Sequence, residues 1–482
     1  MNTENNEHYK NKNIILTTVL LLAFMTSFDG SIINVALPSM SKSLSVNTQS
    51  ISWVFSSYLI AICTLILAFG KLGDLKGKIR VFKTGIFIFT LGSLMCGIST
   101  TLPFLITSRI VQAVGAAAAM ATSQGIITEA VPKNEIGKAF GLFGTFIALG
   151  TMMGAPIGGF IISLFNWNYV FLLNIPFGII TFILCIKFLP KEHVNKGKFP
   201  DIKGFLLFVV TIVTFFFSVI QGGALGYSNP FIIGSFVTSI ITFVLFIYTE
   251  NKSSEPMLDL GLFKSKLFSI SIFCSFLSFV AIFCLLIVNP FYLHYTRECA
   301  PAFIGLLMMF YSIVLTLSAL FSGILSDKTR PEILTFTGLI IMGAGFFLMT
   351  MLGVSTPIPL LLAFMAVIGF GAGLFQSPNN SLVMSAVNRN KLGIAGSVNA
   401  LVRNIGMSVG IAIATTLLYS RMSSKAGYRV LTYIEENDNI FLYGMRYVYT
   451  IAGILCIIGA IITFIRFRNQ KGNINNAKLN AS

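Results

Sequence analysis

Charged residues are scarce in this chain: only 10% of its 482 residues are Asp, Glu, Lys or Arg. Soluble domains carry roughly 25% charged residues, so this composition excludes an ordinary globular enzyme. Hydrophobic residues make up 55% of the chain, and its mean hydropathy is +0.84. The 46 Phe residues cannot all be hidden in a soluble core of this size. The composition therefore predicts an all-α polytopic membrane protein.

Long stretches lack charge altogether. Between Lys138 and Lys187 lie 48 residues without an acidic or basic side chain, and between Glu332 and Arg389 lie 56. A bilayer-spanning helix needs about 20 mostly apolar residues, so each of these gaps holds two helices. The same reasoning along the chain predicts fourteen transmembrane helices. The expected spans are 14–37, 49–70, 81–99, 102–128, 137–165, 168–190, 204–222, 231–249, 267–293, 302–326, 333–353, 357–378, 392–420 and 445–467.

The net charge of +16 follows this topology. If the N-terminus is cytoplasmic, 25 of the 33 Lys and Arg residues fall in cytoplasmic segments. This is the positive-inside rule, and an even number of spans then places both termini in the cytoplasm. The basic residues thus indicate orientation in a bacterial cytoplasmic membrane and not nucleic-acid binding.

Cysteine and histidine are also few, at seven and three residues. The cysteines do not have metal-ligand spacing, so we expect neither a disulfide nor a metal site. A membrane-embedded enzyme would usually show paired acids, a histidine cluster or a nucleophile–base pair near one interface. The sequence has no such group and no loop long enough for a sensory domain, so an enzyme or a sensor is a remote alternative. We expect no cofactor.

A short motif occurs twice. Residues 70–80 follow the second span and contain Asp74, and residues 323–330 follow the tenth span and contain Asp327. Glycine-rich spans come after both copies. We therefore expect two related six-helix bundles with spans 7 and 8 inserted between them, and a functional monomer, since one chain carries both halves. The expected domains are 1–198 (first bundle), 199–255 (insert), 256–468 (second bundle) and 469–482 (a disordered cytoplasmic tail).

Asp29 is the only one of the 17 acidic residues that lies well inside an expected span. An ionisable group at that depth marks a functional site by default. Arg109 lies at a similar depth, since both are roughly 10–12 Å from the outer ends of their helices. Burial favours the neutral acid and a nearby guanidinium favours the carboxylate, so protonation of Asp29 would depend on whether this pair is engaged. A proton-coupled step needs such chemistry; the alternative is a permanent structural ion pair.

Other polar residues inside the spans are candidate substrate contacts. Arg403 has no intramembrane acid to pair with and shares a helical face with Asn399. It would bind backbone carbonyls, a lipid headgroup or an anionic group of a substrate. The candidates are Gln112, Gln376, Asn380, Asn399 and Arg403.

Two glycine-containing segments are candidate moving parts. In residues 70–80, Asp74 can engage a helix N-terminus, while basic side chains can hold acids or lipid phosphates. The second copy of this motif favours a paired cytoplasmic gate. In the fifth span, small residues permit close helix packing and a proline loosens the helix. The gate candidates are Gly70, Asp74, Gly77, Lys78, Arg80, Asp327 and Arg330. The fifth-span candidates are Gly150, Gly154, Pro156, Gly158 and Gly159.

Five of these motifs resemble signatures of the major facilitator superfamily, in its fourteen-helix drug:proton antiporter branch. Residues 28–38 are similar to the first-span signature, whose acid is implicated in proton or cation handling. Residues 70–80 resemble the cytoplasmic-gate motif. Residues 109–115 resemble the fourth-span motif, whose arginine is associated with proton transfer. Residues 150–159 resemble the antiporter motif, and residues 167–178 resemble the sixth-span signature.

The sequence departs from these motifs at three positions. Leu75 replaces a basic residue and Ala113 replaces a glycine. Ala155 stands where the antiporter motif has proline, which follows as Pro156. This departure weakens the case for export over uptake.

The resemblance implies a proton-driven exporter of lipophilic, cationic drugs that works by alternating access. The alternative with the same fold is export of a metabolite, a lipid or a tetracycline-like anion, with Arg403 as the anion contact. Because the second half lacks intramembrane acids, we expect monovalent or neutral lipophilic substrates.

Overall fold

The computed structural model describes residues 11–46, 48–51, 53–190, 201–253, 256–428, 430 and 437–479. Within these ranges the regular structure is helical, without a β-strand. Fourteen helical stretches of this described part are long and apolar enough to cross a bilayer. This number confirms the fourteen expected spans and the all-α fold class.

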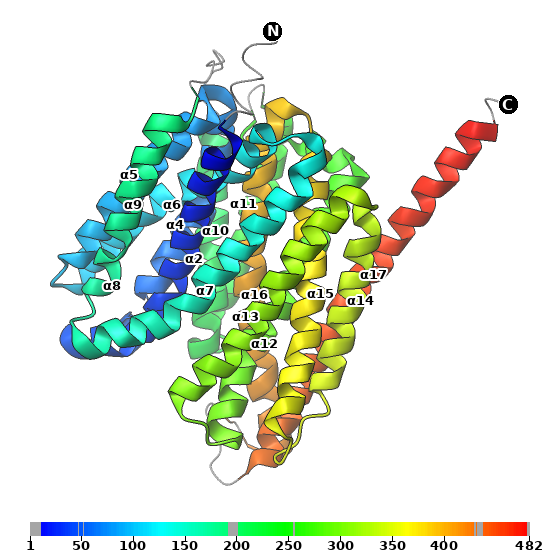
Figure 1. Cartoon of the computed structure of the whole chain (residues 1–482). Coiled ribbons are helices and arrows are strands. Elements are labelled where there is room, and N and C mark those ends of the chain that lie inside the picture. Colours follow the sequence, from blue (N-terminus) through cyan, green and yellow to red (C-terminus); the bar gives the residue numbers. More distant parts are fainter. Residues whose placement is uncertain are drawn as a thin grey trace. The chain divides into compact units, whose positions relative to one another are not determined.

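The helices follow one another along the colour gradient of Figure 1. Their bounds are α2 (Lys12–Ser43), α3 (Thr48–Ile51), α4 (Trp53–Lys76), α5 (Lys78–Gly97), α6 (Leu102–Ala130), α7 (Ile136–Leu164), α8 (Tyr169–Leu172), α9 (Asn174–Phe188), α10 (Ile202–Leu225), α11 (Pro230–Lys252), α12 (Lys266–Phe291), α13 (Pro301–Lys328), α14 (Pro331–Met349), α15 (Ile358–Ser385), α16 (Leu392–Ala426) and α17 (Asp438–Leu479). Short 3₁₀ turns lie at Lys133–Glu135, Leu260–Lys264 and Arg389–Lys391, and a π-helical turn at Tyr292–Thr296 follows α12.

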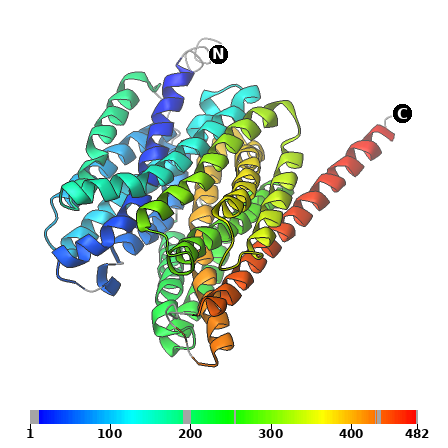
Figure 2. The same cartoon turned by 60° about the horizontal axis from the view of Figure 1, so that its bottom comes forward.

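The C-terminal tail differs from the expectation. Residues 469–482 were expected to be disordered, but α17 continues as one helix to Leu479. Figures 1 and 2 show its red end running on beyond the other helices of its unit. Polar composition argues for exposure to water and does not by itself forbid a helix. The segment after Arg466 has no proline and contains Arg, Gln, Lys, Ala and Leu, which are good helix formers.

The contacts divide the described chain into two compact units, and their borders differ from the expected domains. The first unit comprises residues 1–139, 146–261 and 387–404, and the second comprises 140–145, 262–386 and 405–482. The inserted hairpin of α10 and α11 belongs to the first unit, because α10 packs against α4. The first turns of α16 also belong to it.

The hairpin is held together by hydroxyl groups. Thr211 Oγ1 on α10 lies 2.9 Å from Thr242 Oγ1 on α11, and Ser239 Oγ donates to the Thr211 carbonyl at 3.0 Å. Its outer face is apolar and exposed, with Phe231 81% exposed. Such a face suits contact with lipid, where interhelical hydrogen bonds and packing hold the helices together.

The first unit is built on close contacts between small residues. A Cβ added at Gly115 of α6 would lie 2.2 Å from the backbone nitrogen of Phe89 on α5 and 2.6 Å from the carbonyl oxygen of Gly85. Only glycine permits this approach. An apolar cluster that includes Phe28, Val54 and Phe171 fills the adjoining core. These contacts fix the helices that carry the charged residues.

The second unit repeats this packing. A Cβ at Gly371 of α15 would lie 2.5 Å from the backbone nitrogen of Met342 on α14 and 2.7 Å from the carbonyl oxygen of Gly338. Two further glycines, Gly406 and Gly410 of α16, approach α12, with added Cβ atoms 3.1 and 2.6 Å from its carbonyl oxygens. The two units therefore share a helix-packing scheme, as the repeated motifs predict.

Replacing Gly115 with alanine tests this packing. We expect the substitution to lower the free energy of unfolding by about 1–3 kcal/mol, because the new methyl group overlaps the α5 backbone. Gly159→Ala is the matched control, since a Cβ at that helical position has no atom within 4 Å. The control should be neutral or stabilising by up to about 1 kcal/mol. Thermal melting of the detergent-solubilised protein measures both, and equal melting temperatures would contradict the packing.

Candidate functional site: a buried charge network

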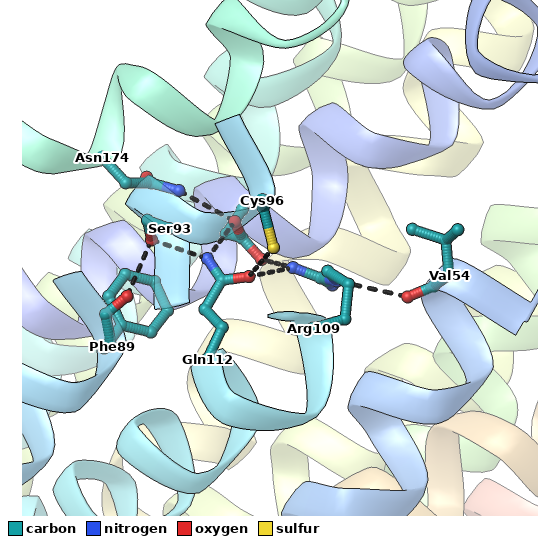
Figure 3. Close-up of polar contacts among 8 residues, drawn as sticks. Val54, Phe89, Ser93, Cys96, Arg109, Gln112 and Asn174 are labelled. Carbon is teal, nitrogen blue, oxygen red and sulfur yellow. Dashed lines mark hydrogen bonds and ion pairs between the residues drawn. The ribbon is translucent and has the colours of Figure 1, made fainter. Parts of the chain in front are cut away.

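Asp29 lies at the centre of a hydrogen-bond network inside the first unit. Its side chain is completely buried on α2. Oδ2 accepts from Arg109 Nη1 at 2.7 Å, and Oδ1 accepts from Gln112 Nε2 at 2.9 Å and from Asn174 Nδ2 at 2.8 Å. Figure 3 shows these donors converging on one carboxylate from α6 and α9. The expected pairing of Asp29 with Arg109 is confirmed.

The Arg109 guanidinium is held from several sides. It is completely buried, and its Nε donates to the carbonyl of Val54 on α4 at 3.2 Å. The Tyr58 ring covers one face, with the guanidinium carbon 3.9 Å from the ring centroid. Arg109 Nη2 has no hydrogen-bond partner in the part of the chain that the structure describes. One donor thus stays free at a point where polar groups are expensive to bury.

Gln112 connects the ion pair to α5. Its Nε2 also lies 2.8 Å from Ser93 Oγ, and its Oε1 accepts from Arg109 Nη1 at 2.5 Å. Because the side chain is completely buried and its amide is fully used, Gln112 belongs to the charge network. Its side chain has no exposed surface in this structure, and the contact with substrate considered from the sequence stays a prediction.

The two charges of this network depend on each other. A buried ion pair is tolerable only when its remaining hydrogen-bonding groups are satisfied, and removing one partner's charge is strongly destabilising. Protonation of Asp29 would cancel its attraction to Arg109 and take one acceptor from the surrounding donors. The arrangement of α2, α4, α6 and α9 around the pair would then change.

The second unit contains a neutral counterpart. Asn289 on α12 is completely buried, and its Nδ2 lies 3.3 Å from the sulfur of Met365 on α15. Met365 precedes Gly371 by six residues, just as Arg109 precedes Gly115 by six. An amide and a thioether therefore stand where the first unit has an acid and a guanidinium. Within the described spans, titratable charge at this level is confined to the first unit.

Asp74 engages the first turn of α16, as the sequence predicts. Its two carboxylate oxygens accept from the backbone nitrogens of Gly393 at 2.8 Å and Ile394 at 2.9 Å. Both residues belong to the first unit. A carboxylate at a helix N-terminus is stabilised by the free N–H groups and by the helix dipole.

Lys78 completes this contact from the start of α5. Its Nζ lies 2.9 Å from Glu129 Oε1 and 3.4 Å from Asp74 Oδ1, and the side chain is buried. Gly77 before it has a φ of 96°, which favours glycine. Gly70 faces α16 so closely that an added Cβ would lie 1.9 Å from Ser397 Oγ. Arg80 is exposed.

The second copy of the gate motif lies in the second unit. Asp327 is half-buried there and Arg330 is exposed. The two copies therefore fall in different units.

The glycines of α7 bring this helix against α2. A Cβ at Gly154 would lie 2.5 Å from Ser31 Cβ, and Ser31 Oγ donates to the Thr151 carbonyl at 2.7 Å. Ser31 is two residues from Asp29, so a movement of α2 against α7 would reach the charge network. The glycines facing α2 are Gly150, Gly154 and Gly158. Gly159 faces open space, and α7 continues as a helix through Pro156.

The other candidate substrate contacts divide between the units. Asn399 is buried in the first unit, where its Nδ2 donates to Gln124 Oε1 at 3.0 Å. Arg403 is half-buried in the same unit. Gln376 and Asn380 are half-buried in the second unit. The structure thus joins Asn399 to Gln124, which sequence reasoning had not singled out.

Sequence reasoning also missed Asn174, Ser93 and Tyr58. Asn174 belongs to the sixth-span motif, but nothing in its spacing shows that it reaches Asp29 from a different helix. The sequence does show that Asn174 is a polar residue inside a span, at a depth similar to that of Asp29. This was the signal that could have predicted their contact.

The fold and this site define the class of protein: a polytopic membrane transporter built from two repeated helical bundles. The sequence profile of the Major Facilitator Superfamily matches residues 19–411 and 271–481. The chain belongs to this superfamily, and it is a transporter and not an enzyme.

Curated relatives agree with this assignment. The chain is 34% identical over 471 residues to the riboflavin transporter RibZ of Clostridioides difficile, covering 97% of this chain and 100% of that protein. It is 28% identical over 417 residues to the multidrug resistance protein Stp of Mycobacterium tuberculosis H37Rv, covering 86% and 78%. It is also 28% identical over 428 residues to the multidrug transporter MdtP of Bacillus subtilis, covering 88% and 79%.

Solved structures show the same fold. The human organic anion transporter MFSD10 matches with a TM-score of 0.66 at 12% identity, covering 94% of this chain and 99% of that one. The proton:xylose symporter XylE matches with a TM-score of 0.62 at 15% identity, covering 94% and 95%.

Replacing Tyr58 tests the packing around Arg109. Tyr58→Leu removes the ring from the guanidinium, and we expect it to lower the free energy of unfolding by about 2 kcal/mol, the scale of a desolvated cation–π contact. Tyr58→Phe is the control, because it keeps the ring and removes only a hydroxyl without a hydrogen-bond partner in the described chain. Thermal melting in detergent measures both variants. A larger loss in Tyr58→Phe than in Tyr58→Leu would contradict this arrangement.

Proposed function

We propose that this transporter is proton-coupled and exports lipophilic small molecules across the bacterial cytoplasmic membrane by alternating access. Both termini would lie in the cytoplasm, as the distribution of Lys and Arg favours. A single chain with two repeated bundles would work as a monomer, driven by the proton gradient without a bound cofactor.

The observation that carries the proposal is the complete burial of Asp29 under three side-chain donors. A charged carboxylate at this depth is costly, and a purely structural polar contact could use neutral residues, as Asn289 does in the second unit. Asp29 is therefore assigned as the proton carrier, and Arg109 as the group that holds it ionised until a proton replaces the pairing.

Export is supported by the glycine stripe of α7. The stripe resembles the antiporter motif and lies against α2, the helix that bears Asp29. The relatives named as multidrug proteins, Stp and MdtP, point in the same direction.

A lipophilic cation was the first substrate expected from the sequence. In the first unit the Asp29 carboxylate is already neutralised by Arg109 at 2.7 Å, so it offers no free negative charge to a cation. The proposal therefore keeps the lipophilic substrate and leaves out a preference for positive charge.

A second candidate function is transport of a flavin-like heteroaromatic vitamin. It is favoured by the 34% identity to the riboflavin transporter RibZ over almost the whole of both chains. Riboflavin is neutral and aromatic, so it too needs no buried acid. Uptake and export are both compatible with this candidate.

The test is transport by purified protein in liposomes with ethidium and riboflavin as probes. We expect an imposed pH gradient to drive accumulation of at least one probe by the wild type. Asp29→Asn should abolish this accumulation and leave exchange of the probe without a gradient, because the neutral amide can still be packed. Glu135→Gln is the control, since it removes a carboxylate from a half-exposed pair with Lys12 and should change neither process.

Gradient-driven accumulation that survives in Asp29→Asn would show that Asp29 is a structural partner of Arg109. Accumulation of riboflavin but not ethidium would favour vitamin transport over export of lipophilic drugs.

A further inference from the structure

Arg403 is a span arginine that is not paired with an acidic side chain in the part of the chain that the structure describes. It is the twelfth residue of α16, so its Cα lies roughly 16 Å along the helix from Leu392. The side chain is half-buried, and it has no hydrogen bond, ion pair or ring contact with the part of the chain that the structure describes. By contrast, Arg109 is paired with Asp29, and Arg466 donates to Ser271 Oγ at 3.0 Å. A guanidinium at such depth usually has a partner.

The surroundings of Arg403 in the first unit are fixed and offer no negative charge. One helical turn earlier, Asn399 donates to Gln124 of α6, and Ser397 Oγ lies 3.3 Å from the Ala121 carbonyl oxygen. The two helices run antiparallel, because an added Cβ at Gly125 would lie 3.5 Å from the backbone nitrogen of Gly393, whereas Ser397 reaches Ala121. Arg403, six residues further along α16, therefore lies at a level beyond Ala121, towards the N-terminal end of α6. That part of α6 carries Met120 and then the alanines 116–119, which cannot neutralise a cation. The helix register therefore places Arg403 at the level of small apolar residues of α6.

The charged side chains inside the described spans of the first unit sum to one net positive charge. Asp29 and Arg109 cancel each other, and Arg403 remains. A positive charge in a medium of low dielectric repels a permanent cation and attracts an anion over several ångströms. Guanidinium also matches the geometry of carboxylate and phosphate oxygens, to which it can donate two parallel hydrogen bonds.

We propose that Arg403 binds a negatively charged oxygen group, a carboxylate or phosphate, of the transported compound. The substrate class is then a lipophilic organic anion, and permanent cations are disfavoured. This inference rests on the proposed transport function and specifies its substrate. Electrostatic repulsion by Arg403 would also make transport of a cation unfavourable, in contrast to the cationic drugs expected from the sequence.

Two dyes with the same xanthene ring system test this selectivity. Fluorescein carries a carboxylate, whereas rhodamine 123 is a cation whose carboxyl group is esterified. In proteoliposomes with a proton gradient, we expect the wild type to move fluorescein faster than rhodamine 123. Arg403→Gln should reduce fluorescein transport about tenfold or more and leave rhodamine 123 unchanged or faster. Arg403→Lys should restore part of the fluorescein transport, since it keeps the charge but loses the two-pronged geometry.

Membrane potential provides a second measurement. Outward movement of an anion in exchange for an incoming proton carries net charge, so an inside-negative potential should accelerate fluorescein export. Exchange of a monovalent cation for one proton carries none. If Arg403→Gln is poorly folded, fluorescein-induced thermal stabilisation of the wild type and of Arg403→Lys still tests binding. Stabilisation by fluorescein but not by rhodamine 123 is expected.

Three results would overturn the inference. Rhodamine 123 moving faster than fluorescein would reverse the selectivity. An equal loss of transport of both dyes in Arg403→Gln would show that Arg403 has a structural role. An effect of Arg403→Gln that disappears in liposomes without anionic phospholipid would assign the guanidinium to a lipid phosphate. Each differs from failure of the proposed function, in which the proton gradient drives none of the dyes, ethidium or riboflavin in any variant.

Discussion

The cost of burying charge in a bilayer determines how the first unit is built. Asp29 and Arg109 can occupy the interior because each supplies the other's counter-charge and because neutral donors take up the rest of the carboxylate. Replacing one such ion pair by apolar residues would often cost nothing. The presence of the pair therefore needs a reason other than stability, and a titratable carboxylate gives one. The close approach of α5 to α6 at Gly115 and of α7 to α2 at Gly154 places helices within reach of this pair.

The two units share their packing and differ in their charge. Gly115 and Gly371 make equivalent close approaches, yet the neighbouring Arg109 of the first unit corresponds to Met365 in the second. The two units therefore differ in the charges that they bury. The first unit holds the buried ion pair, whereas the second unit keeps the helical scaffold with the neutral Asn289 in contact with Met365.

Sequence reasoning predicted most of the helices and the central ion pair, because both follow from one-dimensional properties. Hydropathy predicts spans, and distance from a helix end predicts that Asp29 and Arg109 lie at one depth. It did not predict the contribution of Asn174, since that depends on how α9 is rotated. It also assigned residues 469–482 to disorder, whereas α17 continues to Leu479. The border of the first unit at residues 387–404 depends on Asp74 reaching the start of α16, a contact distant in sequence.

Asp29 is the group whose proton we propose to be exchanged, and proton release in solution tests this most directly. Purified protein in weakly buffered detergent, with a pH indicator dye, would be titrated with a transported compound. We predict that wild type brought into its protonated form at acidic pH releases about one proton per chain when the compound binds and the Asp29–Arg109 pair re-forms, since one buried carboxylate is linked to binding. Asp29→Asn should bind the compound and release none. Equal proton release by the wild type and Asp29→Asn would contradict the account.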